Sequence, residues 1–198
     1  METYEQVKSN FLSGKIKGCK AFFKNHGYSV EEAYCEIILG NLEAAKKIFE
    51  KEQTCNIRAH WGLFLTRMIQ GNIVNSPTYF EIRNFLETDL SILITYCMGE
   101  YVEKIIRYAD FMAYYNSECY KFIGRAFWAN GLMPASMFFL KRAKEKMYND
   151  PELHYMLGYI YYTNDNNIEK CKKELDICLS VLPDYNPAVK LLGKIKKF

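Results

Sequence analysis

The chain has 198 residues, of which 49% are hydrophobic and 25% are charged, and its formal net charge is +3. This length suits one domain or one compact repeat array with a substantial apolar core, and the mixture of charges is typical of a soluble folded protein. The small net charge argues against a dedicated nucleic-acid binder, which usually concentrates more positive charge.

The cysteines and the N-terminal sequence indicate where the protein works. Seven cysteines stand at irregular spacings, and this odd number does not suggest a framework of paired disulfides. The first residues, METYEQVKSNFLSGK, contain no apolar signal-peptide core, and no apolar run is long enough to span a bilayer. We therefore predict a cytoplasmic protein that does not insert into membranes.

The hydrophobic pattern is helical along the chain. Apolar residues recur at spacings of three and four, as in Leu153, Leu157 and Ile160, while the alternating runs typical of strands are scarce. Turn formers interrupt this pattern at short intervals, from Gly14 to the PDYNP segment at 183–187. We predict an all-α protein with about thirteen helices of roughly 10 to 16 residues, joined by short turns.

In the N-terminal half the pattern is irregular. The segment GNLEAAKKIFEK (Gly40–Lys51) combines a turn glycine with a small residue, Ala45, and with Phe49 four residues later. Residues 54–116 offer only isolated anchors, such as Trp61. Any internal repeat is therefore weak in this part of the chain.

In the C-terminal half the sequence repeats itself. Residues 120–131 (YKFIGRAFWANG) align with residues 154–165 (HYMLGYIYYTND) at a spacing of 34 residues, which places Gly124 on Gly158. The helices that follow align at 35 residues. One residue has therefore been inserted at the NDNN turn (164–167), since a loop accommodates insertions best.

This repeat resembles the tetratricopeptide repeat (TPR), a 34-residue helix-turn-helix unit with a pattern of bulky, Leu-Gly, Tyr, small and Pro positions. The residues that match this pattern are His154, Leu157, Gly158, Tyr161, Cys171, Leu175, Cys178 and Pro183. Glycine lets the two helices of a pair approach closely, and the small residues let the next pair dock. Cys171 and Cys178 take these small places, so we predict buried thiols that behave as apolar groups and do not act as nucleophiles.

The resemblance implies a right-handed superhelical array of antiparallel helix pairs, a TPR-like α-solenoid, with about six pairs and a C-terminal capping helix. It covers residues 117–198 and, in part, 28–53, and we interpret 1–27 and 54–116 as degenerate repeats within one domain over 1–198. In such arrays the first helix of each pair lines a concave groove that suits an extended peptide or a partner helix.

The predicted groove residues follow from this alignment. On the last full pair, Leu157, Gly158 and Tyr161 take packing places, which leaves the adjoining stripe of Tyr155, Tyr159 and Tyr162 for the groove. The equivalent stripes contribute Lys121, Arg125 and Trp128 one pair earlier, Lys190, Lys194 and Lys197 on the capping helix, and Tyr34 and Trp61 in the N-terminal half. The contact residues that we predict are Tyr155, Tyr159, Tyr162, Trp128, Lys121 and Arg125.

The function that these features predict is that of a non-catalytic protein-interaction module or scaffold, which binds an acidic and apolar partner segment. No catalytic motif, metal-ligand spacing or cofactor motif is present, and the three histidines, His26, His60 and His154, are isolated. Tyrosines at helical spacing can equally serve as packing residues. Three alternatives stay open: a homodimeric secretion-type chaperone or self-assembling scaffold, an RNA-binding helical-repeat protein, and an enzyme with an unrecognised site.

Overall fold

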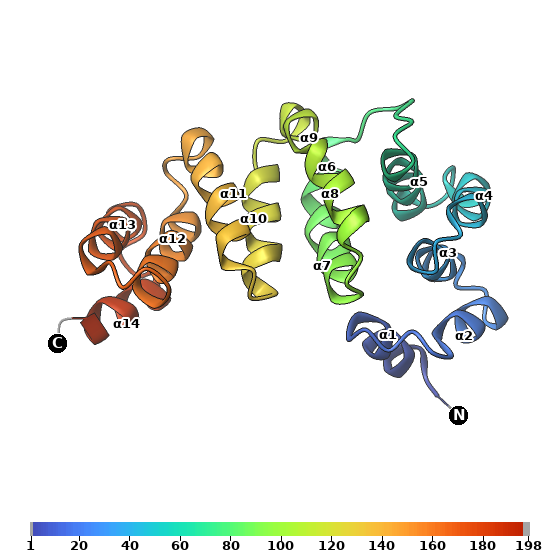
Figure 1. Ribbon diagram of the computed structural model, residues 1–198, viewed down its shortest axis with the longest axis horizontal. Coiled ribbons are helices and arrows are strands. Elements are labelled where there is room, and N and C mark those ends of the chain that lie inside the picture. The colour runs from blue at the N-terminus through green and yellow to red at the C-terminus, as the bar shows by residue number, and fades with distance from the viewer. Residues whose placement is uncertain (1, 196–198) are drawn as a thin grey trace. The chain divides into compact units, whose positions relative to one another are not determined.

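The computed structural model describes residues 2–195, and all regular elements within this range are helices (Figure 1). The all-α prediction is therefore confirmed. The chain divides into two compact units, Met1–Asn116 and Ser117–Phe198, named here the N-terminal unit and the C-terminal unit. We predicted one repeat domain over 1–198, and that interpretation remains a prediction.

The N-terminal unit is a succession of short helices joined by tight turns. The elements are α1 (Tyr4–Leu12), α2 (Cys19–Asn25), α3 (Ser29–Ile38), α4 (Leu42–Glu52), α5 (Ile57–Ile69), α6 (Tyr79–Glu81), a π-helical segment (Ile82–Leu86), α7 (Glu87–Thr95), α8 (Gly99–Arg107) and α9 (Ala109–Tyr115). The π-helical segment continues α6 into α7 without a break. A π turn inside an α-helix is rare and often marks a functional region.

The C-terminal unit contains longer and more regular helices. Its elements are α10 (Cys119–Ala129), α11 (Met133–Lys146), α12 (Pro151–Thr163), α13 (Ile168–Val181) and α14 (Asn186–Ile195). The side chains of Asp150 and Asn167 accept hydrogen bonds from the first turns of α12 and α13, which satisfies backbone donors that a helix start leaves free. Gly131, between α10 and α11, has a φ of 75°, a conformation that favours glycine.

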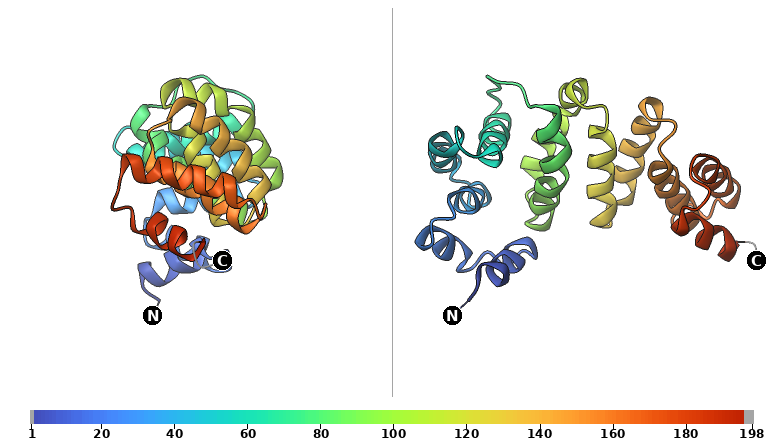
Figure 2. Two further views of the ribbon diagram at one scale, coloured as in Figure 1. Left: turned by 90° about the vertical axis from the view of Figure 1, so that its left-hand side faces the viewer. Right: turned by 180° about the vertical axis from the view of Figure 1, so that it is seen from behind.

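Two antiparallel pairs, α10 with α11 and α12 with α13, form the core of the C-terminal unit (Figure 2). A Cβ atom on Gly124 would lie 2.7 Å from the Leu140 side chain, and one on Gly158 would lie 3.3 Å from the Leu175 side chain. The predicted close approach at both glycines is thus confirmed. Cys171 and Cys178 are fully buried, and burial raises the pKa of both thiols to about 11, which keeps them in the unreactive neutral form.

Packing in the N-terminal unit also depends on a glycine, one that the sequence pattern did not single out. A Cβ atom on Gly62 would lie 2.4 Å from the ring of Phe49, so α5 sits directly on the preceding helix α4. The chain then curves until α1 touches the end of α7, where the Tyr96 hydroxyl donates a hydrogen bond of 2.8 Å to the Phe11 carbonyl. This contact joins the first and later helices of the unit.

One expectation for the N-terminal half is wrong. Trp61 does not line an open groove, because it is fully buried. Tyr34 is only 4% exposed, but it is among the residues that line a hollow of this unit. Within residues 2–195 no helix has both the length and the apolar character needed to cross a membrane.

Candidate partner-binding site

An aromatic cluster joins three elements of the C-terminal unit. The Trp128 ring of α10 lies 6.4 Å from the Tyr155 ring and 5.7 Å from the Tyr159 ring, both on α12. Tyr155 also lies 5.6 Å from Tyr185, in the turn before α14. Most of these contacts are edge-on, the arrangement that aromatic quadrupoles favour. The structure therefore brings together three of the predicted contact residues.

Helical spacing explains why one side of this cluster stays accessible. Tyr155 and Tyr159 stand four residues apart on one stripe of α12, and Tyr162 continues that stripe by one turn. All three are half-buried, whereas Tyr161 is buried at 8% exposure. The prediction of Tyr161 as a core residue is confirmed. Burial raises the pKa of Tyr155 above its usual value, so its hydroxyl stays a hydrogen-bond donor at neutral pH.

A hollow of about 290 Å³ lies between α12 and α14. The side chains that line it are Tyr155, Tyr159, Asn186, Pro187, Lys190, Leu191 and Lys194. Lys190 and Lys194 are exposed, and neither forms an ion pair with another residue of 2–195. Lys197, the third predicted lysine of this stripe, lies outside the described residues. The hollow thus has an aromatic wall and two ammonium groups that can pair with a ligand.

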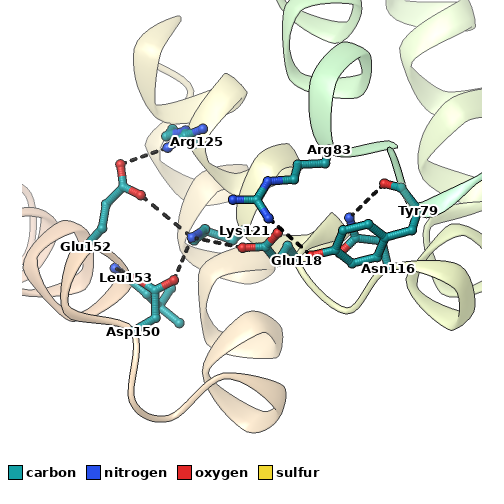
Figure 3. Close-up of polar contacts among 9 residues, drawn as sticks. All are labelled: Tyr79, Arg83, Asn116, Glu118, Lys121, Arg125, Asp150, Glu152 and Leu153. Atoms are coloured by element: carbon teal, nitrogen blue, oxygen red, sulfur yellow. Dashed lines mark hydrogen bonds and ion pairs between the residues drawn. The ribbon is translucent and has the colours of Figure 1, made fainter. Parts of the chain in front are cut away.

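Lys121 has a different environment from the one that the stripe suggested (Figure 3). It is only 7% exposed, and its ammonium group lies 2.5 Å from an Asp150 carboxylate oxygen and 3.7 Å from oxygens of Glu118 and Glu152. Arg125 donates a hydrogen bond of 2.8 Å to Glu152. These pairs tie α10 to the start of α12. We therefore leave Lys121 out of the contact surface that we propose below.

His154 also has a packing role. It is fully buried, with Nδ1 2.6 Å from Glu174 and Nε2 2.5 Å from the Tyr148 carbonyl oxygen. Glu174 accepts a further hydrogen bond of 2.6 Å from Lys144. Burial alone would raise the pKa of Glu174, but these hydrogen bonds hold it below its usual value. The network links α11, α12 and α13.

A pH-dependent loss of stability follows from Glu174. Because its pKa is lower in the folded state, its contribution is complete above the usual value of 4.5 and is lost as the pH falls through the lowered pKa. We expect the stability difference between the native protein and Glu174→Gln to shrink as the pH is lowered from about 6 to about 3.

Urea unfolding of both proteins across this pH range measures that difference. Glu169→Gln is the matched control, since Glu169 is an exposed carboxylate on the same helix. A difference that stays constant at every pH would show that the Glu174 carboxylate does not carry the effect.

The N-terminal unit holds a buried charge cluster that the sequence did not predict. Asp89 is 1% exposed and forms an ion pair with Arg58. Its carboxylate also accepts hydrogen bonds from the Tyr34 hydroxyl at 2.7 Å and from the Trp61 indole at 2.5 Å. Burial raises the pKa of Asp89, against the opposing effects of Arg58 and the two hydrogen bonds. Three side chains from α3 and α5 thus share one buried carboxylate on α7.

The remaining histidines have local partners. His60 contacts the buried Glu81 carboxylate, which also accepts hydrogen bonds from Thr78 at the start of α6. The ring of His26 lies against Phe22. Within residues 2–195, no group of three or more His, Cys, Asp or Glu side chains is arranged to hold a metal ion.

Sequence reasoning missed Tyr185 and the Asp89 cluster. Tyr185 lies in the PDYNP turn, and its two flanking prolines mark only a turn. Asp89 and Arg58 are far apart along the chain, so only the folded unit brings them together. In comparisons with known proteins, no family model matches the sequence, and no curated protein or solved structure shows significant similarity to it.

Proposed function

We propose that this chain is a non-catalytic helical-repeat protein, built as a TPR-like right-handed superhelical array, that binds a segment of a partner protein. The binding site is the hollow between α12 and α14, and the segment that it takes carries acidic and apolar side chains. The observation that carries the proposal is that Tyr155 and Tyr159 line one hollow with Lys190 and Lys194, which form no ion pair within residues 2–195.

The physical basis is the pairing of an apolar wall with nearby positive charge. Aromatic rings supply large contact areas at a small cost in side-chain entropy and are frequent among residues that dominate binding energies. Lysines at the edge of such a surface attract acidic segments and exclude basic ones. The Trp128 ring packs against the rings of Tyr155 and Tyr159, and this packing orders the aromatic wall before a partner arrives.

The proposal can be tested with a short blocked peptide that carries glutamate and leucine side chains. The protein contains two tryptophans, Trp61 in one unit and Trp128 in the other, so its indole N–H groups give two NMR signals. Trp128→Phe assigns them. We expect the acidic peptide to shift the Trp128 signal in a saturable manner, while a matched peptide with arginine in place of glutamate leaves it unmoved.

Substitutions of the two tyrosines that line the hollow provide the second part of this test. Calorimetry should show that Tyr155→Ala and Tyr159→Ala each weaken the acidic peptide about tenfold, which corresponds to about 1.4 kcal/mol. Tyr114→Ala is the control, because Tyr114 is 85% exposed in the other unit. Unchanged affinity in folded Tyr155→Ala and Tyr159→Ala proteins would refute the proposal.

A further inference from the structure

The N-terminal unit contains two adjoining hollows of its own. The first, of about 240 Å³, has apolar walls from Phe11, Leu12, Val30 and Ile92. The second, of about 230 Å³, is more polar and is lined in part by Glu52 and Asn56. Both are lined by Val30, Glu31 and Arg58. They therefore form one continuous surface with an apolar end and a polar end.

Arg58 is a fixed divider between the two hollows. Its guanidinium carbon lies 5.1 Å from the centre of the Tyr34 ring and 4.9 Å from that of Phe85, and the group is paired with the buried Asp89. Two aromatic faces and an ion pair hold a guanidinium in one position. Its positive charge is also largely neutralised by Asp89, so it adds little net charge to either hollow.

The charge that remains is negative at the polar end. Glu31 accepts a hydrogen bond of 2.8 Å from the Tyr4 hydroxyl, and Glu52 lines the same hollow. Neither carboxylate forms an ion pair with another residue of 2–195. Lys8, the other basic residue here, lines only the first hollow. The polar end therefore favours a positively charged group.

The size of the hollows limits what can fill them. Each is smaller than the roughly 300 to 1,000 Å³ of a usual small-molecule site, and each suits a single side chain. Two such compartments side by side match neighbouring side chains of one extended segment. We propose that the N-terminal unit binds a second peptide segment, one that places an apolar side chain against Phe11 and Ile92 and a basic side chain at Glu31 and Glu52.

This second site differs from the α12–α14 hollow in the charge that it selects. The same pair of blocked peptides therefore separates the two proposals. We expect the leucine and arginine peptide to shift the Trp61 indole signal in a saturable manner, because the Trp61 N–H donates to Asp89, the partner of Arg58. The leucine and glutamate peptide should leave Trp61 unmoved, whatever it does at Trp128.

Variants at the rim test the assigned contacts and retain the Arg58–Asp89 ion pair. We expect Glu31→Gln and Glu52→Gln each to weaken the basic peptide about five- to tenfold, as loss of a charge-assisted contact does. Thr88 is exposed and lines the first hollow, so Thr88→Phe should fill it and abolish the Trp61 shift. Glu103→Gln, which removes an exposed carboxylate of α8, is the matched control and should bind normally.

Three results would overturn this inference: no Trp61 shift at millimolar basic peptide, an equal Trp61 shift with the acidic peptide, or undiminished binding by Thr88→Phe. The Trp61 signal of each unliganded variant first confirms that the unit is folded. If the acidic peptide does not shift the Trp128 signal, only the proposed α12–α14 site is refuted. The two proposals can therefore be refuted independently.

Discussion

Asp89→Ala is expected to lower the free energy of unfolding of the N-terminal unit by about 3 to 5 kcal/mol. The carboxylate is 1% exposed and compensates the charge of Arg58 while it accepts hydrogen bonds from Tyr34 and Trp61. Removing it leaves a partly buried guanidinium and two buried donors without their acceptor. Each unsatisfied buried donor adds about 1 to 3 kcal/mol to the loss, although these contributions overlap.

Urea unfolding, followed through the Trp61 indole signal, measures the loss in that unit alone. Glu103→Ala should change stability by less than about 0.5 kcal/mol, as is usual for an exposed position. The double variant Arg58→Leu with Asp89→Leu should recover only the part of the loss that the unpaired guanidinium causes, because an apolar pair can replace a buried ion pair, whereas Tyr34 and Trp61 still lack their acceptor. A loss of less than about 1 kcal/mol for Asp89→Ala alone would contradict a stabilising role of this cluster.

Gly124→Ala and Gly158→Ala are expected to differ, although the two glycines occupy equivalent places in the repeat. A Cβ on Gly124 would lie 2.7 and 2.8 Å from Leu140 side-chain carbons and 3.2 Å from the Leu140 backbone nitrogen. Overpacking of this kind costs about 1 to 3 kcal/mol. A Cβ on Gly158 would meet its nearest atom, on Leu175, at 3.3 Å. The helix propensity of alanine, worth about 0.5 to 1 kcal/mol over glycine, should roughly offset that contact.

Chemical unfolding followed through the Trp128 indole signal gives both values. Gly193 is the control, since a Cβ there meets nothing within 4 Å, and Gly193→Ala should stabilise α14 by about 0.5 to 1 kcal/mol. Equal losses at Gly124 and Gly158 would mean that the approach of α10 to α11 is no closer than that of α12 to α13.

The sequence by itself determined the local features of this protein. The three-and-four spacing of apolar residues predicted helices, because that period places them on one face. The glycine that recurs at a spacing of 34 residues, after Ile123 and after Leu157, located the close helix contacts at Gly124 and Gly158. The position of Tyr161 within the same repeat predicted its burial. Each of these properties depends on residues within one helix or on the helix directly after it.

Only the tertiary structure decided which charges and rings meet. Lys121 lay on the predicted groove stripe, but carboxylates from the next helix pair surround its ammonium group. Asp89 on α7 meets Arg58 on α5 only once the unit has folded, and Tyr185 reaches Tyr155 because α14 lies against α12. Helical periodicity predicts the side of a helix on which a residue lies. It does not predict which distant side chain that residue contacts, because this depends on how the helices pack.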